Sequence, residues 1–184
     1  MQSVHACAVQ TQFFHFTMRT GNQQNNTNKY SKKPPKNLPF FLPEISKDDK
    51  QKMLKTLESK ILTNGPTVER FENSFKKFTN SKNAIGVSNA TSALHLSLMA
   101  LGIGKNDEVI VPNFTFAASV NAIIHCGATP VLVDVDKETW TLDLNKIKKS
   151  ITSSTKAIMP VHIYGKPCRM DELVDIAKKN DLLI

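Results

Sequence analysis

Residues 108–136, "EVIVPNFTFAASVNAIIHCGATPVLVDVD", decide the fold of this chain. The stretch begins with a short apolar run that stops at Pro112, and it returns to a second apolar run at residues 130–134. The segment between them, residues 115–127, is long enough for a helix and closes on a glycine. Short apolar runs joined by a helical crossover are typical of parallel strands that are buried on both faces. The stretch therefore predicts a parallel β-sheet with right-handed connections.

The same alternation of strand and helix continues on both sides of this stretch. Further strands are expected at residues 84–88 and 156–160, and "LLI" at residues 182–184 reads as the start of another strand. Helices are expected between them at residues 91–102, 143–151 and 170–180. The fold class is therefore α/β, with a mainly parallel sheet covered by helices on both faces. In such folds ligands bind at the carboxyl ends of the strands.

Two amphipathic helices are expected upstream of the sheet. Residues 46–62 open with a serine that can cap a helix, and they place Met53, Leu57 and Ile61 on one face. The segment "TNGPT" then breaks regular structure, and residues 68–80 repeat valine and phenylalanine at helical spacing. These helices precede the sheet in the chain and form a separate segment.

The chain divides into three parts by composition. Residues 1–37 are polar and contain prolines, so they bury too little surface to order themselves and are expected to form a disordered extension. Residues 38–83 hold the two upstream helices. Residues 84–184 hold the alternating strands and helices of the α/β domain.

The net charge of +8 does not indicate a nucleic-acid partner. The first 43 residues carry five basic and no acidic residues, so the remaining residues have a net charge of only +3. No stretch combines a basic stripe with interleaved aromatic residues, which nucleic-acid binding commonly requires. The charge balance is that of an ordinary enzyme.

Cysteine usage and hydropathy favour a cytoplasmic protein. Cys7, Cys126 and Cys168 are odd in number and far apart, so they predict neither a disulfide framework nor a metal site. No apolar run approaches the roughly 20 residues that a membrane-spanning helix needs. The beginning of the chain lacks the charged start and apolar centre of a signal peptide. We therefore expect a cytoplasmic location without a membrane or a bound metal.

Residues 88–95, "SNATSALH", place small and hydroxylated side chains where a strand is expected to give way to a helix. The first N–H groups of a helix have no partners within the helix, and its macrodipole adds partial positive charge there. An anion such as a phosphate can complete this site. Taken alone, such a cluster is more often a simple helix N-cap than a phosphate site.

Four stretches resemble one family when they are taken together. "KILTNGPTVERFE", "VSNATSALHLSLMALGIGKNDEVIVPNFTFAASVNAI", "GATPVLVDVD" and "TKAIMPVHIYGKP" occur in the order and spacing of the DegT-type sugar aminotransferases. The resemblance covers residues 38–184. "DKETWTLDLNKI" with "HIYGKPCRMDEL" further resembles the GDP-perosamine synthase branch. The resemblance implies the N-terminal part of the fold type I large domain of pyridoxal-phosphate (PLP) enzymes.

The resemblance also implies an activity and a cofactor site. Enzymes of this family transfer the amino group of L-glutamate to a keto nucleotide-linked sugar, which is used for cell-surface polysaccharides. They use PLP as cofactor, and the complete enzyme is expected to be a homodimer. Ala90, Thr91 and Ser92 correspond to the cup that holds the PLP phosphate. Phe116 corresponds to the aromatic residue that stacks on the pyridine ring, although an aromatic residue near a helix start often belongs to the core.

Four more positions are candidate substrate contacts. Gly65 and Thr67 lie in the "TNGPT" loop, which resembles a segment that family members bring near the sugar. His162 and Tyr164 are expected to end a strand at the ligand-binding edge.

Other polar residues are interpreted as structural. His95 is expected to pack one turn inside its helix. Asp134 and Asp136 follow an apolar strand, where carboxylates commonly stabilise turns and cap helices.

The resemblance places the family's catalytic residues after Ile184. In the family, an acidic partner of the pyridine nitrogen and the lysine that forms the Schiff base follow the matching segment. No lysine of this chain, including Lys156 and Lys166, stands in a comparable context. We therefore expect a truncated aminotransferase that is inactive alone. The alternatives are a non-catalytic fragment or pseudoenzyme that binds a partner subunit or nucleotide-sugar, or a dehydratase-type member with histidine at the lysine position.

Overall fold

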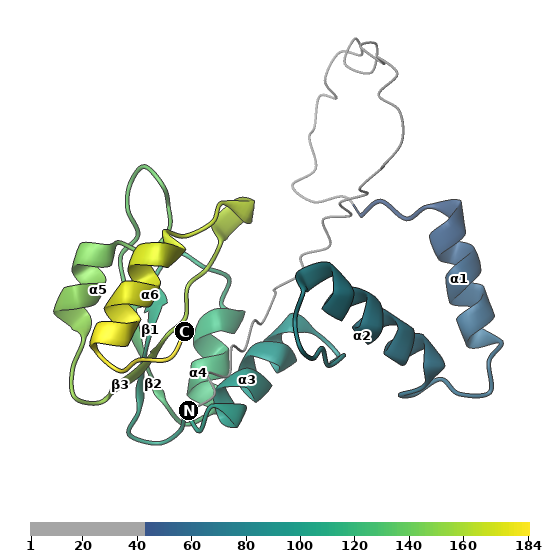
Figure 1. Ribbon diagram of the computed structural model, residues 1–184, viewed down its shortest axis with the longest axis horizontal. Helices are drawn as coiled ribbons and strands as arrows, with labels where there is room; N and C mark the ends of the chain where they lie inside the picture. Colours follow the sequence, from purple (N-terminus) through teal and green to yellow (C-terminus); the bar gives the residue numbers. More distant parts are fainter. Residues whose placement is uncertain (1–42) are drawn as a thin grey trace, which may run out of the picture. The chain divides into compact units, whose positions relative to one another are not determined.

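The structure is a computed structural model that describes residues 43–184 (Figure 1). Within these residues the chain forms two compact units, residues 43–86 and residues 87–184. The predicted disorder of residues 1–37 lies outside the described residues.

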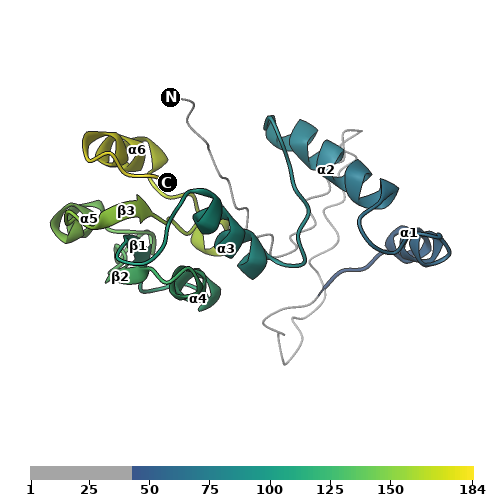
Figure 2. The ribbon, with the colours of Figure 1, turned by 90° about the horizontal axis from the view of Figure 1, so that it is seen from below.

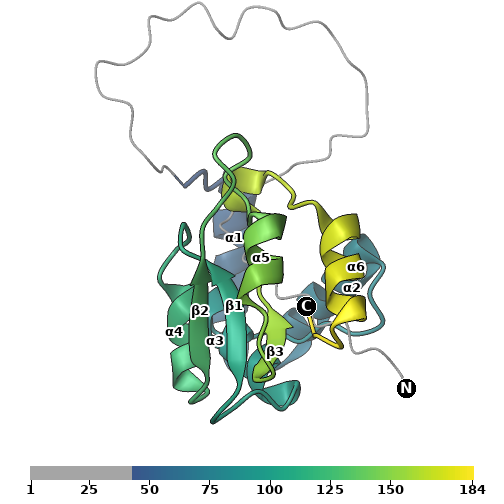
Figure 3. The same cartoon turned by 90° about the vertical axis from the view of Figure 1, so that its left-hand side faces the viewer.

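Three parallel strands form the sheet of residues 87–184, in the order β2–β1–β3 (Figure 3). Their bounds are Glu108–Pro112 for β1, Thr129–Val133 for β2 and Thr155–Ile158 for β3. The central strand β1 pairs in parallel with both neighbours. The predicted strands at residues 108–112, 130–134 and 156–160 are therefore confirmed, with shifts of one or two residues at their ends.

Helices cover both faces of this sheet (Figure 2). Helices α3 (Ala90–Ala100) and α4 (Ala118–His125) contribute to one core, and helices α5 (Leu144–Ser150) and α6 (Met170–Lys179) contribute to the other. Side chains alternate along β1, so Val109 and Val111 are buried in the first core and Ile110 in the second. A strand that is buried on both faces reads as a continuous apolar run, and the predicted architecture is confirmed.

Two glycines end the helices of the first core. Gly102 follows α3 at φ 76°, and Gly127 follows α4 at φ 78°. The N–H of Ile103 donates to the carbonyl of Leu98 at 3.0 Å, which with the Gly102–Met99 bond forms a Schellman motif. These turns end the helices where the chain must return to the sheet.

The predicted strand at residues 84–88 is wrong. These residues have no strand partner among the described residues, and the side chain of Ile85 is 82% exposed. The amide of Gly86 instead donates to Oε1 of Glu72 at 2.7 Å. Because a strand needs a neighbouring edge to bond its backbone, an apolar composition alone does not make one.

The other end of the chain adds a single bridge to the sheet. The N–H of Leu183 donates to the carbonyl of Lys156, and the N–H of Ile158 donates to the carbonyl of Leu183, both at 2.9 Å. The bridge is parallel to β3. The start of a strand expected at residues 182–184 is therefore present as one bridged residue.

Residues 43–86 contain α1 (Lys47–Leu57) and α2 (Pro66–Thr79). The predicted Ser46 cap is confirmed, because Ser46 and Asp49 exchange side-chain and backbone bonds in a capping box. Helix α1 ends at Leu57, so the prediction that Ile61 lies on its face is wrong. The Ser59 hydroxyl donates to the carbonyl of Ile61 at 2.8 Å and favours a turn there.

Candidate functional site

The N-terminus of α3 presents unpaired backbone donors. Asn89 is the N-cap, and its Oδ1 accepts from the N–H of Ser92 at 2.8 Å. Within residues 43–184, no acceptor pairs with the N–H groups of Ala90 and Thr91. Both donors belong to the first turn of a helix of 11 residues, where the macrodipole adds partial positive charge. The arrangement can bind an anion from solution.

Hydroxyl groups surround these donors. The Oγ atoms of Ser88 and Ser92 lie 3.2 Å apart, and Nδ2 of Asn89 donates to Ser88 at 3.3 Å. The first turn of α3 holds no acidic residue that would repel an anion. Amides and hydroxyls without a competing carboxylate suit a phosphate, so the residues predicted as a cup, Ala90, Thr91 and Ser92, fit that group.

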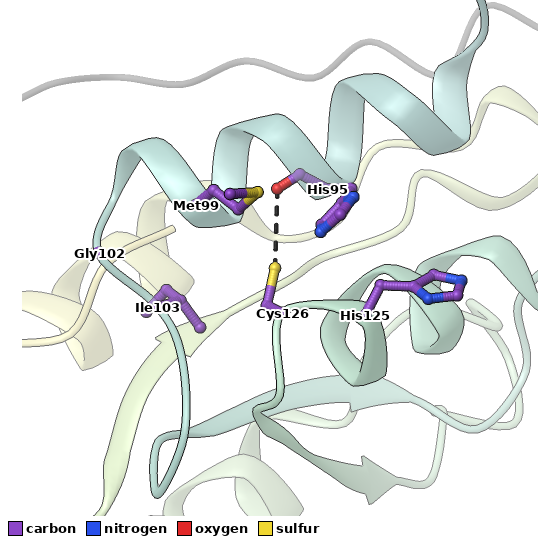
Figure 4. Close-up of a pocket in the computed structure, with 6 residues that line it drawn as sticks. All are labelled: His95, Met99, Gly102, Ile103, His125 and Cys126. Carbon is purple, nitrogen blue, oxygen red and sulfur yellow. Dashed lines mark hydrogen bonds between the residues drawn. The ribbon is translucent and has the colours of Figure 1, made fainter.

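An open hollow begins beside the cup and continues between α3 and α4, and Figure 4 shows the part between the two helices. Thr91 and Ser92 line one end of it, and His95 and His125 lie between the two ends. The two imidazole rings have centroids 5.8 Å apart. His95 was expected to pack inside the helix, but its ring is only half-buried and faces this hollow.

Cys126 lines the hollow opposite His95 (Figure 4). Its Sγ donates to the carbonyl of His95 at 3.7 Å, and burial raises the pKa of the thiol. A protonated thiol is a poor nucleophile and a poor metal ligand. No group of three or more metal-binding side chains occurs in the described part of the chain.

Phe116 lies in the turn between β1 and α4. Its side chain is 64% exposed, and its carbonyl accepts from the N–H of Ser119 at 3.0 Å. The helix expected from residue 115 begins only at Ala118, because residues 113–117 form this turn. The ring is accessible to a planar ligand, and its stacking role stays a prediction.

A carboxylate ties the carboxyl ends of two strands together. Asp134, just after β2, accepts from Nδ2 of Asn113 and from Nζ of Lys146, each at 2.6 Å. The Lys146 ammonium holds the pKa of Asp134 below its usual value, with a smaller effect from Asn113. These contacts agree with a structural interpretation of Asp134.

Asp136 stabilises the next turn. Its Oδ1 accepts from the N–H of Thr139 at 2.8 Å and from the N–H of Glu138 at 3.1 Å. These bonds, the Thr139 bond foremost, lower the pKa of the carboxyl. This is the turn chemistry expected from the sequence.

The candidate substrate contacts belong to two different units of the chain. His162 does not end a strand as predicted, because β3 stops at Ile158 and Pro160 has no N–H to extend the ladder. Instead Nδ1 of His162 accepts from the N–H of Cys168 at 3.2 Å. Tyr164 lies in the short 3-10 helix η1 (Ile163–Gly165), and its side chain is exposed.

Gly65 and Thr67 belong to the unit of residues 43–86. Gly65 is the N-cap of α2, and Oγ1 of Thr67 accepts from Nη2 of Arg70 at 3.2 Å. Their role as substrate contacts stays a prediction.

The sequence interpretation missed Phe114 and Trp140, two aromatic residues that extend from Tyr164. The Phe114 ring lies edge-on to Trp140, with centroids 5.2 Å apart, and its centroid is 6.4 Å from that of Tyr164. Trp140 is the single tryptophan of the chain, and Phe114 lies two residues before Phe116. Both facts were readable, but nothing in the sequence indicates that the three rings meet.

Comparison with known proteins identifies relatives along most of the chain. The DegT/DnrJ/EryC1/StrS aminotransferase family matches residues 43–184. GDP-perosamine synthase of Escherichia coli O157:H7 is 45% identical over 150 residues, which cover 81% of this chain and 41% of the relative. The spore coat polysaccharide biosynthesis protein SpsC of Bacillus subtilis (strain 168) is 44% identical over 147 residues, covering 80% and 38%. The chain thus spans about two fifths of these relatives.

Solved structures show the same likeness. Spr1654 of Streptococcus pneumoniae, solved in a PLP form and a PMP form, matches with a TM-score of 0.75 and 37% identity. The match covers 80% of this chain and 38% of Spr1654. The prediction of a fold type I α/β domain is confirmed. No helix of residues 43–184 is long and apolar enough to cross a membrane. Because the match covers residues 43–184, the chain belongs to the DegT/DnrJ/EryC1/StrS aminotransferase family.

Proposed function

We propose that this chain forms the phosphate-binding part of a PLP site in a sugar aminotransferase. The observation that carries the proposal is the pair of unpaired N–H groups of Ala90 and Thr91 at the N-terminus of α3. Membership of the family and the PLP form of Spr1654 support it. The cofactor, when bound, supplies an electron sink for the transfer of an amino group.

The residues of the site have separate roles in this proposal. The amides of Ala90 and Thr91 and the hydroxyls of Thr91 and Ser92 bind the phosphate. The small side chain of Ala90 leaves room for that approach. The exposed ring of Phe116 contacts the pyridine face through area and dispersion and so orients the cofactor.

The wider activity is part of the same proposal. The amino donor is L-glutamate, and the acceptor is a keto nucleotide-linked sugar used for surface polysaccharides, as the names of the relatives favour. The lysine and the ring-nitrogen carboxylate of the family come from residues outside this 184-residue chain. The complete protein is a homodimer in the cytoplasm. Gly65, Thr67, His162 and Tyr164 are its candidate substrate contacts within this chain.

Thermal denaturation tests the phosphate cup directly. PLP and inorganic phosphate should raise the melting temperature of the 184-residue chain, whereas pyridoxal without its phosphate should have little effect. Thr91→Ala should weaken this protection. Ser97→Ala is the matched control, because it removes a hydroxyl from the same helix two turns away from the cup. Equal protection by pyridoxal and PLP would exclude phosphate recognition at this site.

An amination assay separates the enzyme from a non-catalytic fragment. The 184-residue chain with PLP, glutamate and GDP-4-keto-6-deoxymannose should form no amino sugar, because the proposal places the lysine elsewhere. A longer protein that includes this chain should form it. Turnover by the 184-residue chain alone would mean that one of its own lysines acts as the Schiff-base lysine. A longer protein without turnover would favour the non-catalytic alternative.

A further inference from the structure

Three aromatic rings from separate loops meet at the carboxyl edge of the sheet. Phe114 follows β1, Trp140 lies in the loop after β2, and Tyr164 lies in η1 after β3. Phe114 is the central ring, 5.2 Å from Trp140 and 6.4 Å from Tyr164 between centroids. We call these three residues the aromatic cluster. It lies on the edge where ligands of parallel sheets bind.

The three rings of the aromatic cluster are only partly buried. The side chains of Phe114, Trp140 and Tyr164 are 36%, 49% and 68% exposed. The large apolar residues of both cores are by contrast almost completely buried, such as Ile110 and Ile123. Core packing therefore does not explain why three large aromatic residues gather at this edge.

The backbone at two of the rings is strained. Trp140 has φ 63° and Tyr164 has φ 51°, in the left-handed region that bulky residues rarely adopt. A hydrogen bond from the N–H of Trp140 to the carbonyl of Asp136, at 2.8 Å, holds the first of these conformations. Strained residues of this kind cluster at ligand sites, where the surrounding structure keeps a side chain in position.

Two polar groups in the cluster lack partners. Among residues 43–184, the indole N–H of Trp140 and the phenol oxygen of Tyr164 make no hydrogen bond, and the cluster contains no charged side chain. Trp140 and Tyr164 therefore each offer an apolar face with a donor at the rim that is not bonded within these residues. This combination suits a flat ligand that carries hydrogen-bond acceptors around its edge.

We propose that the aromatic cluster binds the base of the nucleotide-linked sugar. This inference rests on the proposed function, because the base belongs to the sugar substrate of that reaction. A nucleobase stacks on aromatic side chains and offers ring nitrogens or carbonyl oxygens to the free donors. Phe114 and Phe116 share one turn, so the base lies along the same edge as the cofactor ring.

The size of the cluster disfavours a protein partner. At these exposed fractions, the three side chains present on the order of 300–400 Å². A stable protein interface buries about 800 Å² on each side. The exposed area suits one planar small molecule better than a second copy of this chain.

The single tryptophan makes the site visible in solution. Trp140 is the only tryptophan of the 184 residues, so its fluorescence reports on the cluster alone. Titration of the 184-residue chain with GDP should quench this emission until the site is saturated, and ribose 5-phosphate, which lacks a base, should not. Tyr164→Ala should raise the dissociation constant of GDP about 10-fold, the loss expected from one stacking ring.

Matched variants separate stacking from loss of folding. Tyr164→Phe keeps the ring and should keep most of the affinity for GDP. Phe78→Ala removes an exposed aromatic ring from the other unit and should leave GDP binding unchanged. Phe116→Ala should weaken PLP binding but spare GDP quenching, which separates this site from the cofactor site.

Several results would overturn the inference. These are the absence of saturable quenching, equal quenching by ribose 5-phosphate, or equal GDP affinity in the Tyr164→Ala variant. Trp140 emission that changes with protein concentration instead of GDP would assign the cluster to a second copy of the chain. Protection by PLP without a response to GDP would leave the proposed function standing and reject only this inference. A response to GDP without protection by PLP would reject the phosphate cup, and it would leave the aromatic cluster as a nucleotide site of another function.

Discussion

Replacing the N-cap of α3 should separate the stability of the helix from the binding of phosphate. Asn89→Ala removes the oxygen that accepts from the N–H of Ser92 at 2.8 Å. Loss of such a cap costs about 1 kcal/mol, with a range of roughly 0.5–2 kcal/mol. Helix α3 buries Leu94 and Leu98 in the core, so fraying of its first turn should weaken the whole unit. For a unit of about 100 residues, this cost lowers the melting temperature by ~4–8 °C.

Phosphate binding should respond differently from stability. In the Asn89→Ala variant the N–H of Ser92 becomes a third unpaired donor beside those of Ala90 and Thr91. The affinity for inorganic phosphate should therefore be kept or increased although the helix is less stable. Thr91→Ala should show the opposite pattern, because the Thr91 hydroxyl has no hydrogen bond within residues 43–184 and its loss costs little stability.

Urea denaturation with and without phosphate measures both quantities. The free energy of unfolding in buffer reports the cap, and its increase with phosphate concentration reports the affinity of the folded state. If Asn89→Ala were as stable as the original chain, the cap would contribute nothing. If both variants lost stability and phosphate affinity together, the cup would not be distinct from the cap.

Three further changes have defined outcomes. Gly102→Ala should cost about 1 kcal/mol in urea denaturation, because φ is 76° and an added Cβ meets no atom within 4 Å, so the backbone conformation alone is strained. The pKa of Asp134 is lowered chiefly by Lys146, so its contribution to stability is present above its ordinary pKa of 3.8 and is lost as the pH falls below it. Asp134→Asn should therefore show a smaller loss of stability in acid denaturation than the original chain. Tyr164→Gly should raise the free energy of unfolding by about 1 kcal/mol relative to Tyr164→Ala, since glycine adopts φ 51° without strain, and equal stabilities would mean that no strain is stored there.

The sheet and its covering helices were predictable because their signals are local and repeated. Residues 108–112 and 130–134 are apolar runs that end at proline or aspartate, and the helices before β1 and β2 close on Gly102 and Gly127. Each of these signals holds whatever the rest of the chain does. The strand order β2–β1–β3 was not predicted, because right-handed crossovers allow other orders as well.

The prediction of a strand at residues 84–88 was wrong because the pairing of strands is not a local property of the sequence. "AIGVS" has the composition of a strand, yet Gly86 finds its acceptor on Glu72, and Ile85 remains exposed. Strand formation depends on an available sheet edge, whereas composition indicates only that a segment is compatible with the strand conformation. The predicted end of β3 was two residues too late for a related reason, since Pro160 has no N–H to donate to a neighbouring strand.

The two candidate sites differ in how far the sequence could reveal them. Ala90, Thr91 and Ser92 are consecutive, and the geometry of one helix terminus brings their donors together. The members of the aromatic cluster stand 26 and 24 residues apart along the chain, at positions 114, 140 and 164. They meet only because parallel strands return to the same edge, which no local pattern encodes.

The turn after the central strand carries one residue of each proposed site, Phe114 and Phe116. Val109, Ile110 and Val111 are completely buried, so β1 packs against both cores up to its carboxyl end. The turn that follows carries Phe114 and Phe116, and Asn113 fixes that turn to Asp134 at the end of β2. We expect a ligand that contacts either phenylalanine to restrict the turn that positions the other one. On this basis, binding of PLP and binding of the nucleotide should favour each other, and the coupling should weaken when Asn113→Ala releases the turn.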